Sequence, residues 1–252
     1  MDVTAYLKRI KYSGSLAPTA ETLCDLQVAH LLAVPFENLS IHARQPIVLD
    51  DNALFTKIVE HRRGGFCYEV NGLFAALLRA LGFKVEMLSA GVANAEGGFG
   101  PDFDHMALMV TINERWLADV GFGDSFIEPL LLDERDVQRQ GGRTYKIVRE
   151  GDYLILMQRE NEGEWKTQYR FTLQPYEYAD YAEMCWYHQT SPQSPFTQRR
   201  ICSRATEEGR LTLSEMRFIT TSKNDERQEQ ILASQEEYEA MLREHFGIII
   251  TN

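Results

Sequence analysis

The sequence is short of basic residues and has no long apolar run. Lysine and arginine number 26 against 37 aspartate and glutamate residues, which gives a formal charge of −11. Nucleic acids and anionic membranes are bound by basic surfaces, so we expect neither as a partner. The apolar runs are short and interrupted by charge, and Met1–Tyr12 lacks the apolar core of a signal peptide. These absences predict a cytoplasmic protein without a membrane anchor.

Cysteines are also few, and none forms a Cys-x-x-Cys pair. The four are Cys24, Cys67, Cys185 and Cys202. A chain of 252 residues does not need disulfides to fold, so we expect reduced thiols, at least one of them free for chemistry. No cluster of cysteine and histidine has the spacing of zinc ligands, and we expect no metal.

The apolar pattern of residues 1–83 predicts a helical bundle. Thr19–Ala33 has apolar positions three and four residues apart, and a second such series runs from Cys67 to Leu81. Gly64-Gly65 ends a shorter helix before it, and Gly82 is a natural stop after it.

The rest of the chain predicts β-structure and then a mixed region. Residues 84–188 contain alternating strand segments separated by turn residues, which predicts an antiparallel barrel. In residues 189–252, short strands precede Ser234 and Glu237, which have the spacing of a capping box. Gln189–Thr197 has the composition of a loop. The expected fold class is α+β.

Cys67 is the first candidate for chemistry because it follows a Gly-Gly turn and begins a helix. The N–H groups and macrodipole at a helix N-terminus stabilise an anion, which favours a thiolate and supplies donors for an oxyanion. Most free cysteines are instead small buried apolar residues. Position alone does not decide between these interpretations.

A reactive thiolate needs a histidine, oriented in turn by a carboxylate or amide. Among six histidines, His105 opens a predicted strand after a glycine-rich loop. Asp119 interrupts an apolar strand, where a carboxylate is costly unless paired. A two-residue turn at Asn113-Glu114 would place Asp119 opposite Leu108 and turn His105 to the other face. The pairing therefore needs a longer turn, a bulge, or a His105 outside the ladder; a core histidine with a separate turn aspartate is the alternative.

Five segments together resemble the arylamine N-acetyltransferase family, over the range from about Tyr6 to Thr221. The segments are Pro35-Phe36-Glu37-Asn38-Leu39, Arg63-Gly64-Gly65-Phe66-Cys67-Tyr68-Glu69, Asp104-His105-Met106, Trp116-Leu117-Ala118-Asp119-Val120-Gly121-Phe122-Gly123 and Ser191-Pro192-Gln193-Ser194-Pro195-Phe196. The resemblance implies an N-terminal helical bundle, a central antiparallel β-barrel and a C-terminal α/β lid around a Cys-His-Asp core like that of cysteine proteases. It implies acetyl transfer from acetyl-CoA to arylamines or arylhydrazines, by a ping-pong mechanism through an acetyl-cysteine.

The resemblance also assigns roles to single residues. It implies that Cys67 is the nucleophile, His105 its base and Asp119 the orienting carboxylate. Glu37 and Arg63 would form a charged pair supporting the site, although an ordinary surface ion pair explains them as well. Further residues implied are pocket walls and coenzyme A contacts: Phe122 and Phe196 for the substrate pocket, and Phe99, Gly100, Thr197 and Arg199 for the cofactor.

Coenzyme A is polyanionic and would need a local basic site on this acidic chain. Arg199, Arg200 and Arg204 are candidates for its phosphates, although solvated strand-edge charges explain them as well. The chain is short after Thr221, so we expect a trimmed lid. The sequence does not determine whether the protein is a monomer or a homodimer, or which amine is its physiological substrate.

Three rival functions share parts of the pattern. Macrolactam-forming amide synthases resemble the same family and use a tethered polyketide thioester instead of acetyl-CoA. Papain-like and transglutaminase-like hydrolases use similar catalytic residues but leave the Pro-Phe-Glu-Asn and Ser-Pro-x-Ser segments unexplained. A binding module would keep the pocket without chemistry, against which the set of Cys67, His105 and Asp119 argues.

Overall fold

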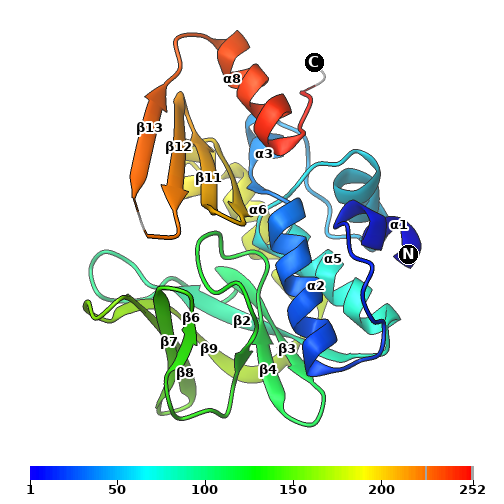
Figure 1. Ribbon diagram of the computed structural model, residues 1–252, viewed down its shortest axis with the longest axis vertical. Helices are drawn as coiled ribbons and strands as arrows, with labels where there is room; N and C mark the ends of the chain where they lie inside the picture. Colours follow the sequence, from blue (N-terminus) through cyan, green and yellow to red (C-terminus); the bar gives the residue numbers. More distant parts are fainter. Residues whose placement is uncertain (225, 251–252) are drawn as a thin grey trace.

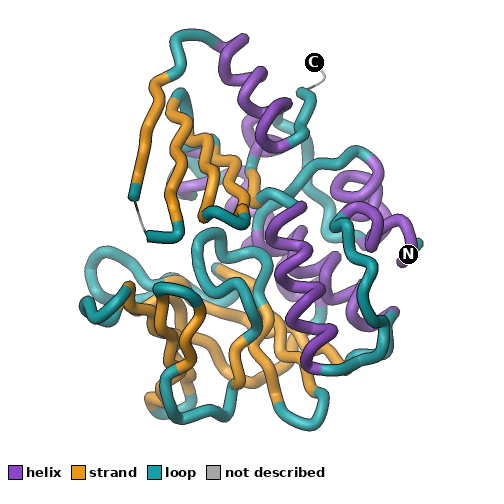
Figure 2. The backbone as a smooth tube through the Cα atoms, in the orientation of Figure 1, coloured by secondary structure: helices purple, strands orange, loops and turns teal. Residues whose placement is uncertain are grey.

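The computed structural model describes residues 1–224 and 226–250 of the chain. Most helices gather on one side, and two separate groups of strands lie beside them (Figure 2). In Figure 1 the barrel strands are green and most strands of the other sheet are yellow to orange. The fold is α+β, as predicted.

The N-terminal part is helical, with one short strand. Its helices are α1 (Val3–Arg9), α2 (Ala20–Ala33), α3 (Leu39–His42), α4 (Asp51–Phe55), the π-helix η1 (Thr56–Glu60) and α5 (Cys67–Ala80). Thr19 caps α2 by accepting a hydrogen bond from the Thr22 N–H group, and Asp50 caps α4 in the same way. The predicted helix starts at Thr19 and Cys67 are therefore correct to within a residue.

Eight antiparallel strands form a nearly closed barrel, in the spatial order β5-β4-β3-β2-β9-β8-β7-β6. They are β2 (Lys84–Val92), β3 (His105–Thr111), β4 (Arg115–Ala118), β5 (Leu130–Leu131), β6 (Gln138–Gln140), β7 (Arg143–Glu150), β8 (Tyr153–Glu160) and β9 (Lys166–Tyr176). The two edge strands are joined by a side chain: Leu131 donates its N–H to Gln138 Oε1 (2.8 Å) and accepts from Gln138 Nε2 (2.9 Å). A glutamine amide thus replaces the missing backbone pairing.

The C-terminal sheet has five antiparallel strands and includes a strand from the N-terminal part. Its order is β1 (Phe36–Glu37), β10 (Ile201–Thr206), β11 (Gly209–Ser214), β12 (Arg217–Ser222) and β13 (Arg227–Ile231). The helix α8 (Gln235–Met241) continues as the π-helix η3 (Leu242–Phe246). Ser234 accepts the Glu237 N–H, and the Glu237 side chain accepts the Ala233 N–H, so the predicted cap is present.

The connection between barrel and C-terminal sheet is more helical than predicted. It contains the 3₁₀-helix η2 (Tyr178–Tyr181), α6 (Ala182–Thr190) and α7 (Pro195–Gln198). The prediction of a loop at Gln189–Thr197 is thus wrong at both ends. Proline at the first helical position and the Ser194 cap allow the short α7. The proposed domain boundaries at 83/84 and 188/189 stay predictions.

Strand β3 is the shared wall between helices and barrel. Met106, Leu108 and Val110 belong to the core that includes α5, whereas Ala107 and Met109 face the barrel interior. Both faces of β3 are therefore buried, which explains its continuous apolar sequence.

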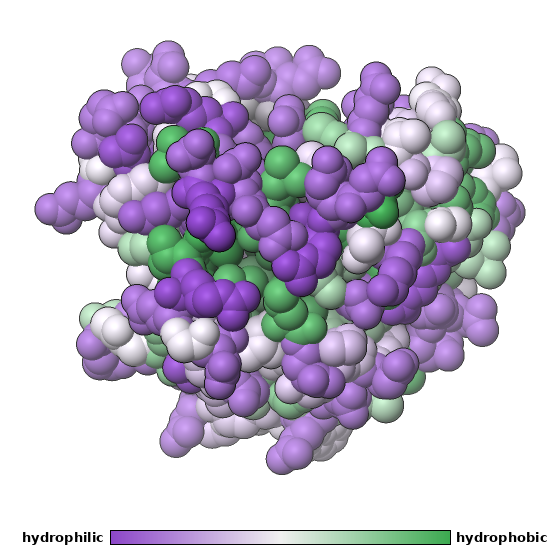
Figure 3. Space-filling model, turned by 90° about the horizontal axis from the view of Figure 1, so that it is seen from below, coloured by the Kyte–Doolittle hydropathy of each residue, from purple (hydrophilic) through white to green (hydrophobic). Residues whose placement is uncertain are grey.

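The surface seen from below is mostly hydrophilic, with small hydrophobic areas between the polar side chains (Figure 3). Isolated exposed apolar side chains of this kind are normal on a globular protein. Within residues 1–224 and 226–250, no helix has the length and apolar character needed to cross a membrane.

Candidate active site

Cys67 is the first residue of α5 and is buried, with 3% of its surface exposed. The chain approaches it closely on two sides. A Cβ atom at Gly64 would lie 1.9 Å from the Pro35 carbonyl oxygen, and one at Gly121 would lie 2.8 Å from Cys67 Cα. Both contacts exclude a side chain, so the glycines of the two motifs let the backbone close around the start of the helix.

The surroundings of the Cys67 thiol oppose its ionisation. Burial raises its pKa well above the ordinary value, the backbone N–H of Met106 lowers it, and the nearby Asp119 and Asp104 raise it further. The thiolate expected from the helix position alone is therefore not favoured by these surroundings, since desolvation outweighs the N–H donor. A reactive Cys67 needs a proton acceptor next to it.

His105 lies next to the Met106 N–H that meets the Cys67 thiol and is paired with Asp119. His105 Nε2 is 2.7 Å from Asp119 Oδ2, and both side chains are buried. Thr111 pairs with Arg115, so three residues connect β3 to β4 instead of two. The extra residue brings Asp119 to the face that carries His105, because side chains alternate along a strand. Of the alternatives left open by the sequence, the longer turn is correct.

Asp119 is held by neutral donors in addition to His105. Its Oδ1 accepts from Asn71 Nδ2 (2.9 Å) and from the Gly121 N–H (2.8 Å). Its Oδ2 also accepts from the Tyr169 hydroxyl (3.2 Å). These donors fix both carboxylate oxygens and hence the direction of the His105 ring.

Asn71 was not singled out by the sequence, although it lies one helical turn after Cys67. Its amide donates to the Met106 carbonyl (2.6 Å) and accepts from the Val120 N–H (2.9 Å), in addition to its bond to Asp119. It thus joins α5 to β3 and to the segment after β4. The available signal was a polar residue between the apolar Val70 and Leu73, because a buried polar side chain is costly unless it is hydrogen-bonded.

The two predicted pocket aromatics both lie against catalytic candidates or their neighbours. The Phe122 ring is 5.2 Å from the His105 ring and 4.9 Å from that of Tyr169, centroid to centroid. The Phe196 ring is 5.6 Å from that of Phe66, which precedes Cys67. Phe122 thus borders the predicted base, and Phe196 borders the segment of the predicted nucleophile.

Glu37 is buried and pairs with Arg63, which is partly buried. Glu37 Oε1 lies 3.0 Å from Arg63 Nε, and Oε2 accepts the Leu39 N–H at 2.7 Å. Burial would raise the Glu37 pKa, but the charges of Lys57 and Arg63 outweigh it and hold the pKa below its usual value. An ordinary surface ion pair is therefore excluded, because the Glu37 side chain has no exposed surface.

The predicted cofactor residues lie in two segments. Phe99 and Gly100 are in the loop before β3, where the Arg170 guanidinium lies 4.9 Å from the Phe99 ring centroid. Thr197 is in α7, and its hydroxyl donates to the carbonyls of Ser191 (2.7 Å) and Ser194 (2.9 Å), which precede the helix. Arg199 follows α7.

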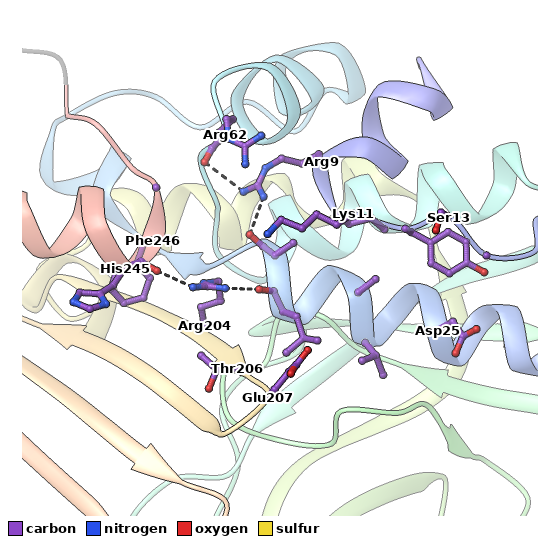
Figure 4. Close-up of a pocket in the computed structure, with 18 of the residues that line it drawn as sticks. Arg9, Lys11, Ser13, Asp25, Arg62, Arg204, Thr206, Glu207, His245 and Phe246 are labelled. Carbon is purple, nitrogen blue, oxygen red and sulfur yellow. Dashed lines mark hydrogen bonds between the residues drawn. The ribbon is translucent and has the colours of Figure 1, made fainter.

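Arg200 and Arg204 already have partners within the protein. The Arg200 guanidinium lies 4.4 Å from the Tyr238 ring centroid and 3.6 Å from Glu215. Arg204 donates to the Leu32 and His245 carbonyls at the wall of a cavity of about 1020 Å³ (Figure 4). This cavity lies between α2 and the C-terminal helix and contains none of the catalytic candidates. Arg204 therefore acts mainly as a structural link.

Comparison with known proteins agrees with this geometry. The N-acetyltransferase family matches residues 19–252. Arylamine N-acetyltransferase of Escherichia coli is 33% identical over 246 residues, which cover 96% of this chain and 87% of that enzyme. Proansamycin X synthase of Amycolatopsis mediterranei is 32% identical over 251 residues, which cover 96% and 95% of the two chains.

A solved structure has the same fold. Arylamine N-acetyltransferase of Mycobacterium marinum in complex with CoA superimposes with a TM-score of 0.91 at 31% identity, covering 98% of this chain and 93% of that one. Sequence, fold and family match thus agree over nearly the whole length. The chain belongs to the arylamine N-acetyltransferase family, whose members are acyltransferases.

Proposed function

We propose that the protein transfers an acetyl group from acetyl-CoA to an arylamine or arylhydrazine through an acetyl-Cys67 intermediate. The observation that carries the proposal is the buried His105–Asp119 pair next to the Met106 N–H that meets the Cys67 thiol. Family membership supports the acetyl donor and the amine acceptor, since a relative is named for the amine and another has CoA bound.

In the first half-reaction, His105 accepts the Cys67 proton. Because Asp119 accepts the hydrogen bond from Nε2–H, Nδ1 is the nitrogen with a free electron pair. The thiolate attacks the acetyl carbonyl carbon, and N–H groups in the first turn of α5 stabilise the oxyanion. The bond from carbon to the coenzyme A sulfur then breaks, and His105 returns the proton to the departing sulfur.

In the second half-reaction, the amine nitrogen attacks the acetyl-Cys67 carbonyl. His105 takes a proton from the nitrogen, the bond from carbon to Cys67 sulfur breaks, and the thiol is regenerated. Two displacements through one covalent intermediate predict ping-pong kinetics. Asp119 keeps the imidazole tautomer constant and stabilises its charged form in both steps.

Mass spectrometry of the intact protein tests the intermediate. Incubation with acetyl-CoA alone should add one acetyl group, located at Cys67, and an arylamine added afterwards should remove it. Cys24→Ser is the matched control, because Cys24 is half-buried and lines the cavity that contains none of the catalytic candidates; it should behave as the wild type. Turnover without an acetylated Cys67 would contradict the mechanism.

We further propose that coenzyme A contacts Phe99, Gly100, Thr197 and Arg199. Arg199 is the favoured phosphate contact, because Arg200 and Arg204 are engaged by Tyr238 and by backbone carbonyls. Arg199→Ala should raise the KM for acetyl-CoA without changing the rate at which acetyl-Cys67 reacts with amine. An unchanged KM would remove Arg199 from the site.

The match to proansamycin X synthase favours one second function, amide formation from a polyketide thioester on the same fold. The same mass measurement separates the two. An amide synthase of this kind would not load an acetyl group from acetyl-CoA onto Cys67. The cytoplasmic location and the monomeric or homodimeric state stay predictions.

A further inference from the structure

His188 lies on α6 and contacts three segments of the site without belonging to the predicted triad. Its exposed fraction is 2%. Nε2 lies 3.2 Å from Asp104 Oδ1, and Nδ1 lies 3.0 Å from Ser194 Oγ. The ring stacks on Tyr68 at a centroid distance of 6.1 Å and meets the Phe196 ring edge-on at 5.1 Å. A buried polar ring with these partners fixes the segments around it.

Asp104, the residue before His105, is itself partly buried and held by hydrogen bonds. Its Oδ2 accepts the Val92 N–H at 3.3 Å, and its carbonyl accepts the Tyr68 hydroxyl at 3.2 Å. A Cβ atom at Gly100 would lie 2.4 Å from Asp104 Oδ2, so only glycine leaves room for this carboxylate. Any displacement of Asp104 therefore moves the start of the strand that presents His105.

Ser194 connects His188 to α7 and Phe196. Its Oγ caps α7 by accepting the Phe196 N–H at 3.2 Å, while the same oxygen faces His188 Nδ1. Phe196 packs on Phe66, which precedes Cys67. One imidazole thus joins the residue before the predicted base to the aromatic wall beside the predicted nucleophile.

Charge adds a second link between His188 and the thiol. Asp104 is one of the carboxylates whose charge raises the Cys67 pKa. His188 Nε2 lies 3.2 Å from Asp104 Oδ1 without hydrogen-bond alignment, so the imidazole packs against this carboxylate and shields it from the site. Loss of the imidazole would leave Asp104 facing the site without this partner.

We infer that His188 is a positioning residue of the acetyl-transfer site. Through Asp104 it holds the strand that presents His105, and through Ser194 it holds Phe196. It touches neither substrate nor cofactor in this role. The inference rests on the proposed function, because the residues that His188 positions are those proposed to form and use acetyl-Cys67.

The test compares His188→Gln, Asp104→Asn and the double variant in the full chain. Two rates are measured: single-turnover acetylation of Cys67 by acetyl-CoA, and alkylation of Cys67 by iodoacetamide at neutral pH. His188→Gln should slow both by about tenfold, in the range found for coupled neighbours. In the double variant the alkylation rate should recover towards that of the wild type, because the amide that replaces the Asp104 carboxylate no longer raises the Cys67 pKa.

Matched controls are His61→Gln and Asp102→Asn, since both side chains are exposed and lie outside the network. Neither should change either rate. If the double variant is slower than His188→Gln by the full effect of Asp104→Asn, the two residues act independently and the inference is wrong. It is also wrong if His188→Gln leaves both rates unchanged.

A second variant and a readout that needs no acyl donor complete the test. If His188→Gln does not fold, Ser194→Ala removes the Nδ1 partner together with the cap of α7 and leaves the Asp104 contact in place. It should raise the KM for the amine while the alkylation rate stays constant, and an unchanged KM overturns the link to Phe196. If wild-type Cys67 takes no acetyl group from acetyl-CoA, the proposed function fails. The alkylation rates still measure the coupling, because iodoacetamide needs no acyl donor.

Discussion

Among the buried carboxylates near the start of α5, Asp119 and Glu37 are neutralised in different ways. Asp119 accepts hydrogen bonds from an amide, a backbone N–H, a phenol and an imidazole. Glu37 accepts from the Arg63 guanidinium and from two backbone N–H groups, with the Lys57 charge nearby. In the described part of the chain, no lysine or arginine pairs with Asp119.

The difference indicates that the Asp119 charge acts in the reaction, whereas the Glu37 charge stabilises the fold. Neutral donors hold the Asp119 carboxylate in place but leave its charge to act on His105, where an imidazolium must form during the reaction. Cations cancel the Glu37 charge, so the pair fixes the Pro-Phe-Glu-Asn segment against the Gly-Gly turn before Cys67. Removal of Asp119 should therefore affect rate, and removal of Glu37 should affect stability.

The largest effect is expected from Asp119→Asn. The amide oxygen stays with the Asn71 and Gly121 donors, so the NH2 group faces Nε2 and favours the wrong imidazole tautomer. This should lower kcat/KM by about 10³–10⁴-fold. Steady-state kinetics with acetyl-CoA and an arylamine measure this. Asp133→Asn is the control, because its carboxylate pairs with Arg115 on the surface. A loss below about tenfold would remove the distinction between the two carboxylates.

Glu37→Gln should cost stability rather than rate. Breaking a buried pair leaves the Arg63 guanidinium without its partner and typically lowers the free energy of unfolding by about 3–5 kcal/mol. Denaturant titration measures it, and kcat per folded molecule should change less than about tenfold. Glu229→Gln, which removes an exposed partner of Arg217 and Arg227, should cost at most about 1 kcal/mol. A Glu37→Gln variant of normal stability and low kcat would reverse the comparison.

Acid should reduce the stability difference between wild type and Glu37→Gln. The Glu37 pKa is held below its ordinary value, so the unfolded state binds the proton more readily. The stabilisation is complete above the unfolded pKa and is lost as the pH falls through the lower folded pKa. Burial raises the pKa of Glu69 and the Glu37 charge raises it further, so the Glu69 contribution is larger in the wild type and offsets part of the change in the difference. Unfolding free energies from about pH 7 to below about pH 4 measure the gap; a constant gap would contradict the ion pair.

The smallest effect is expected from Tyr169→Phe. It removes one of the neutral donors to Asp119, a contact of 3.2 Å, while the others remain. A single hydrogen bond of this kind contributes about 1 kcal/mol, so kcat/KM should fall by about fivefold. Tyr145→Phe, another buried tyrosine of the barrel, is the control and should leave kcat/KM unchanged. Equal effects of the two changes would show that Tyr169 acts only through packing.

Helix periodicity and capping residues predicted the helical part well, because those signals are local. The misses have physical causes too. Strand β13 is exposed along its whole length and polar, so its sequence lacks alternation. Helix α6 has no single apolar face and keeps Trp186 exposed. Asn71 and Tyr169 were missed because their roles depend on partners distant in the chain.

For the site, the sequence motifs predicted which residues take part but not how those residues are arranged. The family resemblance implied that Glu37 and Arg63 form a pair, and in the structure the pair holds Glu37 with no exposed surface. Arg200 and Arg204 were considered for coenzyme A, yet contacts within the chain engage both. A guanidinium carries the same sequence signal whether it binds a ligand or a backbone carbonyl.

By itself, the sequence determined that Cys67 begins a helix, that β3 and β4 form a hairpin, and that the motifs of one acyltransferase family occur in order. Only the tertiary structure decided whether Asp119 faces His105, since one additional residue in a hairpin connection turns a side chain to the opposite face. It also decided the environment of the thiol. Ionisation depends on burial and on charges brought together by packing, neither of which is local in the chain.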